Sequence, residues 1–105
     1  MKTIAIGTLS CILAVGLLHA GAPEGKELFT AKCQACHGAN GEGKAAIAKM
    51  MNVTLPPLAS QEVQAKSDAE LKKVILSGSG KMKPIAGVTE KQAGDIVAFL
   101  RTLKK

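Results

Sequence analysis

The sequence predicts a small all-α domain, and three observations support this fold class. Apolar residues recur at helical spacing near the C-terminus, at Ala93, Ile96, Val97, Leu100 and Leu103. Residues 67–70 and 89–92 each have the pattern of a capping box, which marks the start of a helix. No segment alternates apolar and polar residues as a half-buried strand does. The 105 residues leave room for one domain.

The first half of the domain is expected to contain two helices and two loops. In chain order these are a helix, a glycine-rich loop, a short helix and a proline-containing loop, beginning at Pro23, Gly38, Ala45 and Asn52. Proline suits the first turn of a helix, and the acidic Glu24 suits the positive end of the helix dipole. Leu28 and Phe29 give the first helix an apolar side. Residues 38–43 hold three glycines, which favour a loop.

Two further helices complete the predicted domain. One begins at Ser67 and ends at Gly78. Its apolar face is formed by Leu71, Val74 and Ile75. Residues 77–84, with two glycines and a proline, are predicted to be irregular. The last helix follows Thr89, and Phe99 widens its apolar face.

The segment Cys-Gln-Ala-Cys-His at residues 33–37 is the most informative part of the sequence. The pattern C-x-x-C-H is typical of the attachment site of a c-type haem. The thiols of Cys33 and Cys36 are spaced to add to two vinyl groups on one edge of a porphyrin, and His37 then lies under the ring as the proximal iron ligand. The sequence therefore predicts one covalently bound haem c.

Two other kinds of site use a pair of cysteines at this spacing. A zinc site needs about four ligands, and outside the motif the chain offers only Cys11 and His19, both in an N-terminal segment expected to be removed. A thiol–disulfide site of the thioredoxin type is expected in a βαβ context, and no strand pattern is present. The residues therefore favour haem attachment.

Taken with its surroundings, the motif makes the chain resemble the small single-haem cytochromes c whose iron is bound by one histidine and one methionine. The matching features occur in family order: a helix with Gly25 and Phe29, the haem motif, a proline loop, a methionine in a Gly/Pro loop, and a C-terminal helix carrying Phe99. The resemblance implies a cytochrome c fold of three to five helices wrapped around one haem. It also implies that Gly25 permits a close crossing of the first and last helices.

Met82 is predicted to be the sixth iron ligand. Once the N-terminal segment is removed, His37 is the only histidine, which leaves methionine, lysine, water or no ligand for the other face of the iron. Met50 and Met51 follow a helical run of small residues and are predicted to fill the core. Met82 lies in a loop between glycines and a proline, and the family resemblance places the axial methionine in such a loop.

The surroundings of the two ligands are also suggested by the resemblance. Lys83 follows Met82, where many relatives have proline. The Nδ1–H group of His37 needs an acceptor to fix the ring. In the family a proline carbonyl downstream of the motif accepts this hydrogen bond. Pro56 and Pro57 are both candidates, and Pro57 is preferred because it leads into Leu58.

The composition indicates that the haem forms part of the core. The chain has two phenylalanines and no tryptophan or tyrosine. A domain of this size buries little apolar surface of its own. We therefore expect the haem-free chain to be largely unfolded.

The charge balance points to protein partners. The chain has 14 Lys and Arg against 8 Asp and Glu. It lacks aromatic residues for base stacking and any nucleic-acid motif, so no nucleic acid is expected to bind. In the family, lysines ring the exposed haem edge near the methionine loop. The chain is expected to be a monomer, and acidic redox proteins are expected to dock on it at Lys32, Lys44, Lys81 and Lys83. The expected electron donor is a reductase or dehydrogenase. The expected acceptor is an oxidase or other terminal enzyme.

Residues 1–20 are predicted to be a signal peptide, and residues 21–105 the cytochrome c domain. Lys2 precedes an apolar run, and Ala20 offers a small residue for cleavage. Export to the periplasm fits covalent haem attachment, which in this family is completed outside the cytoplasm. The alternative is a retained anchor in the inner membrane facing the periplasm, since the uncharged stretch approaches the roughly 20 residues that span a bilayer. Membrane contact is expected only in that case.

Together these features predict an electron carrier and not an enzyme. One alternative is a membrane-tethered cytochrome c subunit of a respiratory or dehydrogenase complex. Another is a haem sensor or peroxidase-like enzyme, which needs an open iron position and an acid–base residue beside it. With His37 bound to iron, no second histidine remains after residue 20 for that work.

Overall fold

A computed structural model describes residues 21–104. The predicted signal peptide, with Cys11 and His19, lies outside the described residues. Within them the chain forms six helices and no strand: α2 (Ala22–Lys32), α3 (Gln34–His37), α4 (Ala45–Met51), α5 (Gln61–Gln64), α6 (Asp68–Ser77) and α7 (Glu90–Thr102). The all-α prediction is confirmed. The helices exceed the predicted three to five, because the first helix is interrupted at Cys33, which separates α3 from α2, and because the single-turn α5 was not expected. No helix in this part of the chain combines the length and the hydropathy needed to cross a bilayer.

Both predicted capping boxes are formed. The Ser67 hydroxyl accepts a hydrogen bond from the Glu70 backbone N–H at 3.1 Å, and the Glu70 carboxylate accepts one from the Ser67 N–H at 2.8 Å. The Thr89 hydroxyl and the Gln92 side chain make the same pair at 3.1 and 2.9 Å. These contacts satisfy N–H groups that a helix start would otherwise leave free. They therefore set where α6 and α7 begin.

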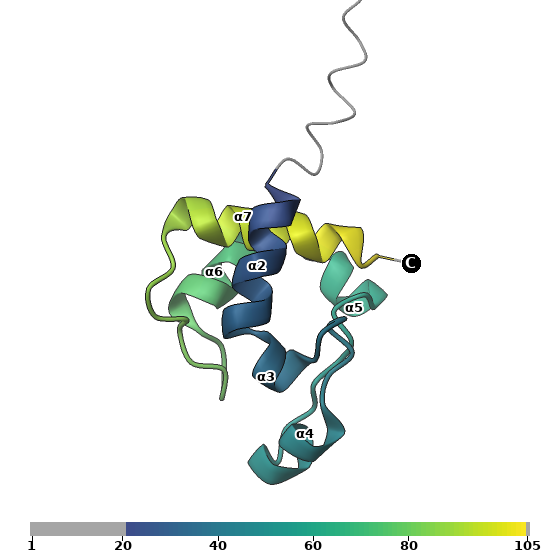
Figure 1. Ribbon diagram of the computed structural model, residues 1–105. Helices are drawn as coiled ribbons and strands as arrows, with labels where there is room; N and C mark the ends of the chain where they lie inside the picture. Colours follow the sequence, from purple (N-terminus) through teal and green to yellow (C-terminus); the bar gives the residue numbers. More distant parts are fainter. Residues whose placement is uncertain (1–20, 105) are drawn as a thin grey trace, which may run out of the picture.

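The centre of the fold is a crossing of α2 over α7 (Figure 1). Gly25 lies at the crossing, where a Cβ atom would collide with the backbone carbonyl of Asp95. One turn further on, the rings of Phe29 and Phe99 meet at 5.2 Å between centroids with an interplanar angle of 52°. The close helix approach predicted at Gly25 is present. The buried core around it comprises Phe29, Cys33, Val63, Leu71, Ile75, Ala93, Ile96, Val97, Phe99 and Leu100.

Arg101 fastens α7 to the segment that joins α5 and α6. Its guanidinium donates to the Asp68 carboxylate at 2.7 and 3.1 Å and to the backbone carbonyls of Gln64 and Lys66 at 3.0 and 2.7 Å. The Gln64 side-chain amide donates to the carbonyls of Leu58 and Leu100, both at 2.9 Å. This network holds the proline-containing loop beneath the C-terminal helix.

Helix α4 stands apart at the lower end of the molecule (Figure 1). Met50 lies on it with 73% of its surface exposed, so the prediction that Met50 fills the core is wrong. The reason is helical geometry: Ile47 and Met51 are four residues apart and face inward, whereas Met50 lies on the other side of this short helix. Met51 is half-buried.

Candidate haem-binding site

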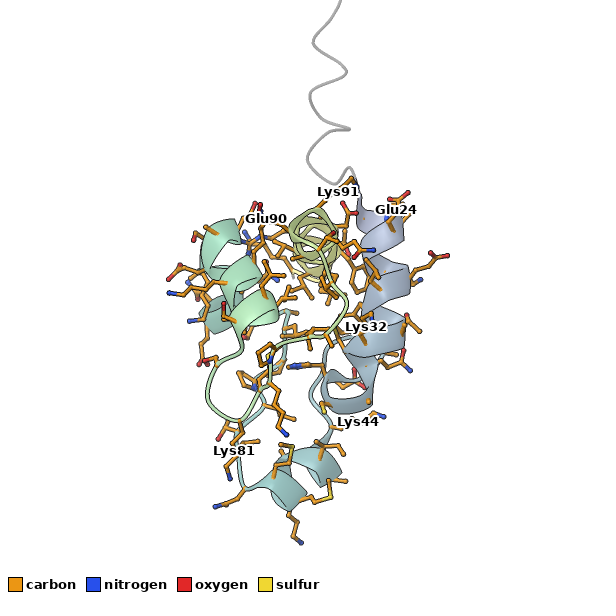
Figure 2. All side chains as sticks on the ribbon, turned by 90° about the vertical axis from the view of Figure 1, so that its left-hand side faces the viewer. Glu24, Lys32, Lys44, Lys81, Glu90 and Lys91 are labelled. Carbon is orange, nitrogen blue, oxygen red and sulfur yellow. The ribbon has the colours of Figure 1, made fainter. Side chains whose placement is uncertain are left out.

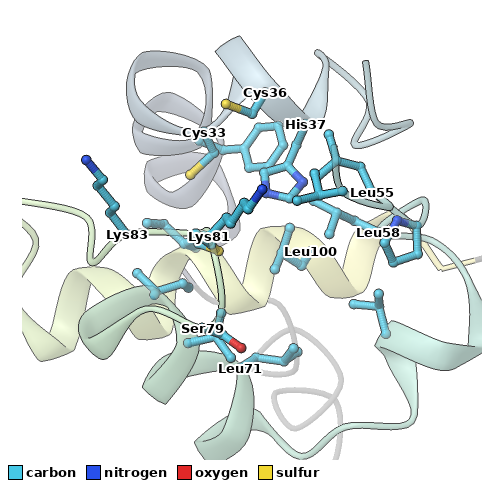
Figure 3. Close-up of a pocket in the computed structure, with 18 of the residues that line it drawn as sticks. Cys33, Cys36, His37, Leu55, Leu58, Leu71, Ser79, Lys81, Lys83 and Leu100 are labelled. Atoms are coloured by element: carbon cyan, nitrogen blue, oxygen red, sulfur yellow. The ribbon is translucent and has the colours of Figure 1, made fainter. Parts of the chain in front are cut away.

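A pocket of about 620 Å³ opens beside the crossing of α2 and α7. Its volume lies within the roughly 300–1,000 Å³ typical of cofactor sites. Segments from α2 and α3, the proline-containing loop, α6, α7 and the turn at residues 79–83 contribute to its walls (Figure 3). Its apolar lining includes Leu55, Leu58, Leu71, Val74, Ile75 and Leu100.

Cys33 and Cys36 both line this pocket as free thiols. Cys33 is the residue between α2 and α3 and is only 7% exposed, whereas Cys36 is exposed on α3. Burial raises the pKa of the Cys33 thiol to about 11, although the neighbouring Lys32 opposes the shift. A thiol with so high a pKa is protonated at neutral pH, which disfavours the thiolate chemistry of a disulfide exchange site.

His37 ends α3, and its ring points into the pocket (Figure 3). Burial lowers the pKa of this imidazole, which favours the neutral form that binds a metal. Its Nδ1 atom is buried without a hydrogen-bond partner. A buried polar atom without a partner costs about 1–3 kcal/mol, so such atoms commonly mark functional positions.

Met82 reaches the same pocket from the loop that follows α6. Ser79 and Met82 exchange two backbone hydrogen bonds of 2.8 Å, which close a tight turn. Gly78 makes this turn possible, because its φ is +81° and a Cβ there would lie 2.6 Å from the carbonyl oxygen of Met82. The structure thus brings all four predicted site residues, Cys33, Cys36, His37 and Met82, to one pocket.

Residues 20–100 match the family described as cytochrome c oxidase, cbb3-type, subunit III. The chain belongs to this family of c-type cytochromes. A curated relative, cytochrome c-554(547) from Halothiobacillus neapolitanus, is 35% identical over 88 residues, an alignment that covers 79% of this chain and 97% of the relative.

Two solved structures share the fold. The KustC0563 c-type cytochrome superposes with a TM-score of 0.67 at 26% identity, over 77% of this chain and 98% of the other. Cytochrome cL from Hyphomicrobium denitrificans superposes with a TM-score of 0.64 at 25% identity, over 84% of this chain and 50% of the other. As a c-type cytochrome, the chain carries covalently bound haem c and transfers electrons between redox partners.

The pocket of the cytochrome fits a haem on the grounds of its own chemistry. The thiols of Cys33 and Cys36 and the imidazole of His37 line the pocket from one segment of the chain, and the thioether of Met82 lines it from another. The walls between them are largely apolar, as the flat porphyrin requires. Among residues 21–104, no three His, Cys, Asp or Glu side chains lie close enough together to hold a metal ion by themselves.

Lysines of the cytochrome gather near the pocket. Lys32, Lys81 and Lys83 line it, as the resemblance implied, and Lys44 lies toward the same end of the molecule as Lys81 (Figure 2). Lys66 also lines the pocket, which the sequence did not indicate. No periodicity or motif distinguishes Lys66, because its place depends on the turn between α5 and α6.

Proposed function

We propose that this cytochrome shuttles single electrons between protein partners through a haem c attached to Cys33 and Cys36, with His37 and Met82 as its axial ligands. The meeting of these four side chains in one pocket supports the proposal most directly. The haem supplies the reversible ferric/ferrous couple. A thioether and an imidazole suit both oxidation states, and His/Met ligation raises the reduction potential.

The protein's own residues hold and shield the group. The neutral imidazole of His37 faces the pocket, and its Nδ1–H group would donate to a proline carbonyl that fixes the ring. The sequence favoured Pro57, but Pro56 suits this role better, because Pro56 lines the pocket and Pro57 does not, and the Pro57 carbonyl already accepts a 3.0 Å hydrogen bond from the Ser60 N–H. The apolar walls exclude water.

A filled sixth position argues for electron transfer without bond chemistry. Ligation by Met82 would leave no iron position open to oxygen or peroxide. In the described chain no second histidine is available as an acid–base group. We therefore propose that the chain is not an enzyme. Ready binding of carbon monoxide to the reduced protein would contradict this.

Replacing Met82 tests the ligand set. In a Met82→Ala variant, the weak near-infrared sulfur-to-iron band of the oxidised protein should disappear, because the iron loses its thioether. Absorption spectra of both oxidation states report this directly. Met51→Ala is the control, since Met51 also lines the pocket and should leave the band in place. Persistence of the band in the Met82 variant would exclude Met82 as the ligand.

The proposed location is the periplasm. We propose that residues 1–20 are a signal peptide removed on export, leaving residues 21–105 as the cytochrome domain. The family description names an oxidase subunit, which favours a membrane-tethered form as the second candidate. Intact mass and N-terminal sequencing of the mature protein separate the two: a start at Gly21 supports a free carrier, and a start at Met1 supports a tether.

We further propose that partners are acidic and dock at the pocket end of a monomer. Among the described residues, those that line the pocket include Lys32, Lys66, Lys81 and Lys83 and no Asp or Glu. Figure 2 shows Glu24, Glu90 and Lys91 at the opposite end. Lys91 is paired there with Asp95 at 3.1 Å. Every Lys, Arg, Asp or Glu side chain that lines the pocket is therefore positively charged, whereas acidic residues are present at the opposite end.

This arrangement predicts a salt-dependent rate. Oxidation of the ferrous protein by an anionic complex such as ferricyanide should slow by about tenfold between roughly 0.01 M and 0.5 M ionic strength, because salt screens the lysines. Stopped-flow absorbance measures this rate. Lys83→Gln should lower it at low salt more than Lys91→Gln, although both remove one charge. Equal effects of the two variants would show that net charge alone governs the encounter.

A further inference from the structure

The Lys81 side chain bridges two segments of the pocket rim. Its ammonium donates a 2.7 Å hydrogen bond to the backbone carbonyl of Met51, 30 residues away. Lys81 stands directly before Met82 in the loop after α6, and Met51 is the last residue of α4. Lys81, Met51 and Met82 all line the pocket.

The chemistry of the acceptor explains this contact. The last carbonyls of a helix have no partner within the helix, and they lie at the negative end of its dipole. At the end of α4, the N–H groups of Asn52 and Val53 bond to the carbonyls of Ala48 and Lys49. They leave the Met51 carbonyl to Lys81, and a cation is the favoured partner at such a position.

Few other contacts fasten the methionine loop across the pocket. Its backbone hydrogen bonds join Ser79 to Met82 within the turn and Ile85 to Ile75 of the preceding helix. Among the hydrogen bonds of residues 21–104, the one made by Lys81 alone connects residues 78–84 with residues 43–60. Breaking it would leave residues 78–84 with no hydrogen bond to residues 43–60, although a 3.3 Å hydrogen bond from Lys32 to the Ala86 carbonyl still ties the later part of the same loop to α2.

We infer that Lys81 is a positioning residue that holds the Met82 loop closed over the haem and so limits how often Met82 leaves the iron. The inference rests on the proposed ligation by Met82. Lys83 provides the contrast: it lies equally close to Met82 in sequence, yet it makes no side-chain hydrogen bond within the described part of the chain, and its side chain points away from that of Lys81 in Figure 3. Both lysines place a positive charge near Met82, but only Lys81 makes the hydrogen bond across the pocket, and this bond distinguishes it from Lys83.

Ligand exchange on the loaded ferric protein tests this role. Excess imidazole replaces the Met82 thioether on the iron, and at saturating imidazole the rate reports how often the loop opens. Lys81→Ala should increase this limiting rate about three- to tenfold, the effect expected from losing one hydrogen bond. Lys83→Ala removes the same charge and should stay within about twofold of the unmodified protein. Lys81→Arg keeps a long cationic donor and should restore most of the slow exchange.

The outcomes separate this role from the ligand assignment. Equal rates in the Lys81→Ala and Lys83→Ala variants would overturn the role of Lys81 while leaving ligation by Met82 intact. Absence of the near-infrared band in the unmodified protein would instead overturn the ligation and the inference together. A fast-exchanging Lys81→Arg variant would also contradict the bridge, because the donor would have been retained.

Discussion

A Cys33→Ala/Cys36→Ala chain produced without haem is expected to lack a cooperative thermal transition. Without the haem the core would contain an unfilled, largely apolar pocket of about 620 Å³ that opens to solvent. The apolar side chains that line this pocket would then face water and lose the contacts that a bound porphyrin supplies. Small domains have only about 5–15 kcal/mol of stability in total, so a loss of this kind at the centre of the core is expected to be decisive. The polypeptide has only two phenylalanines and no other aromatic residue, so it buries little apolar surface that could offset this loss.

Circular dichroism measures this outcome. The haem-loaded parent should melt in a single sharp step, whereas the haem-free variant should show weak helicity that changes gradually with temperature. Adding free haem to the variant is the internal control, because His37 and Met82 remain and should recover part of the helical signal. A native-like, cooperative melt of the haem-free variant would show that the polypeptide core suffices by itself.

A Gly25→Ala substitution is expected to destabilise the loaded protein by about 2–3 kcal/mol. The added methyl group would collide with the Asp95 carbonyl and lie 2.9 Å from the Ile96 backbone nitrogen, so α2 and α7 would have to separate. Alanine suits a helix better than glycine by up to about 1 kcal/mol, but this gain is smaller than the cost of the clash. For a domain of this size the melting temperature should fall by about 10–20 °C.

Gly94 provides the matched control for this experiment. It lies inside α7, and a Cβ atom there would meet nothing within 4 Å. Gly94→Ala should therefore stabilise the protein by about 0.5–1 kcal/mol, opposite in sign to the change at Gly25. Thermal melts of the parent and the two variants measure both changes in stability. A Gly25→Ala protein as stable as the Gly94→Ala protein would mean that the helices cross with more room than the structure gives them.

Local sequence signals were sufficient for much of the fold. Ser67 and Thr89 could be identified as helix starts because a capping box is made entirely within four residues. The haem motif is likewise contiguous, so Cys33, Cys36 and His37 could be named without the fold. Met82 needed a family resemblance, since its loop reaches the pocket only through the turn at Gly78.

Features that depend on distant contacts could not be predicted in this way. Helix α5 has one buried side chain, that of Val63, and one turn of helix gives no usable periodicity. The exposure of Met50 follows from the position of α4 outside the core, which its apolar sequence conceals. The hydrogen bonds of Lys81 and Arg101 join residues at least 30 positions apart, and no local pattern specifies them.

The crossing at Gly25 has a consequence for the order in which the molecule comes apart. It joins the first and last helices described, and the Arg101 network and the buried residues of α6 hold much of the intervening chain against α7. The turn at residues 79–82 can fluctuate while this framework stays joined, because the turn is closed mainly by its own backbone bonds. Local opening at Met82 and separation of α2 from α7 are then distinct events with different free energies. With Met82 as the proposed ligand, the cytochrome can thus expose its iron for an instant and still keep its tertiary structure.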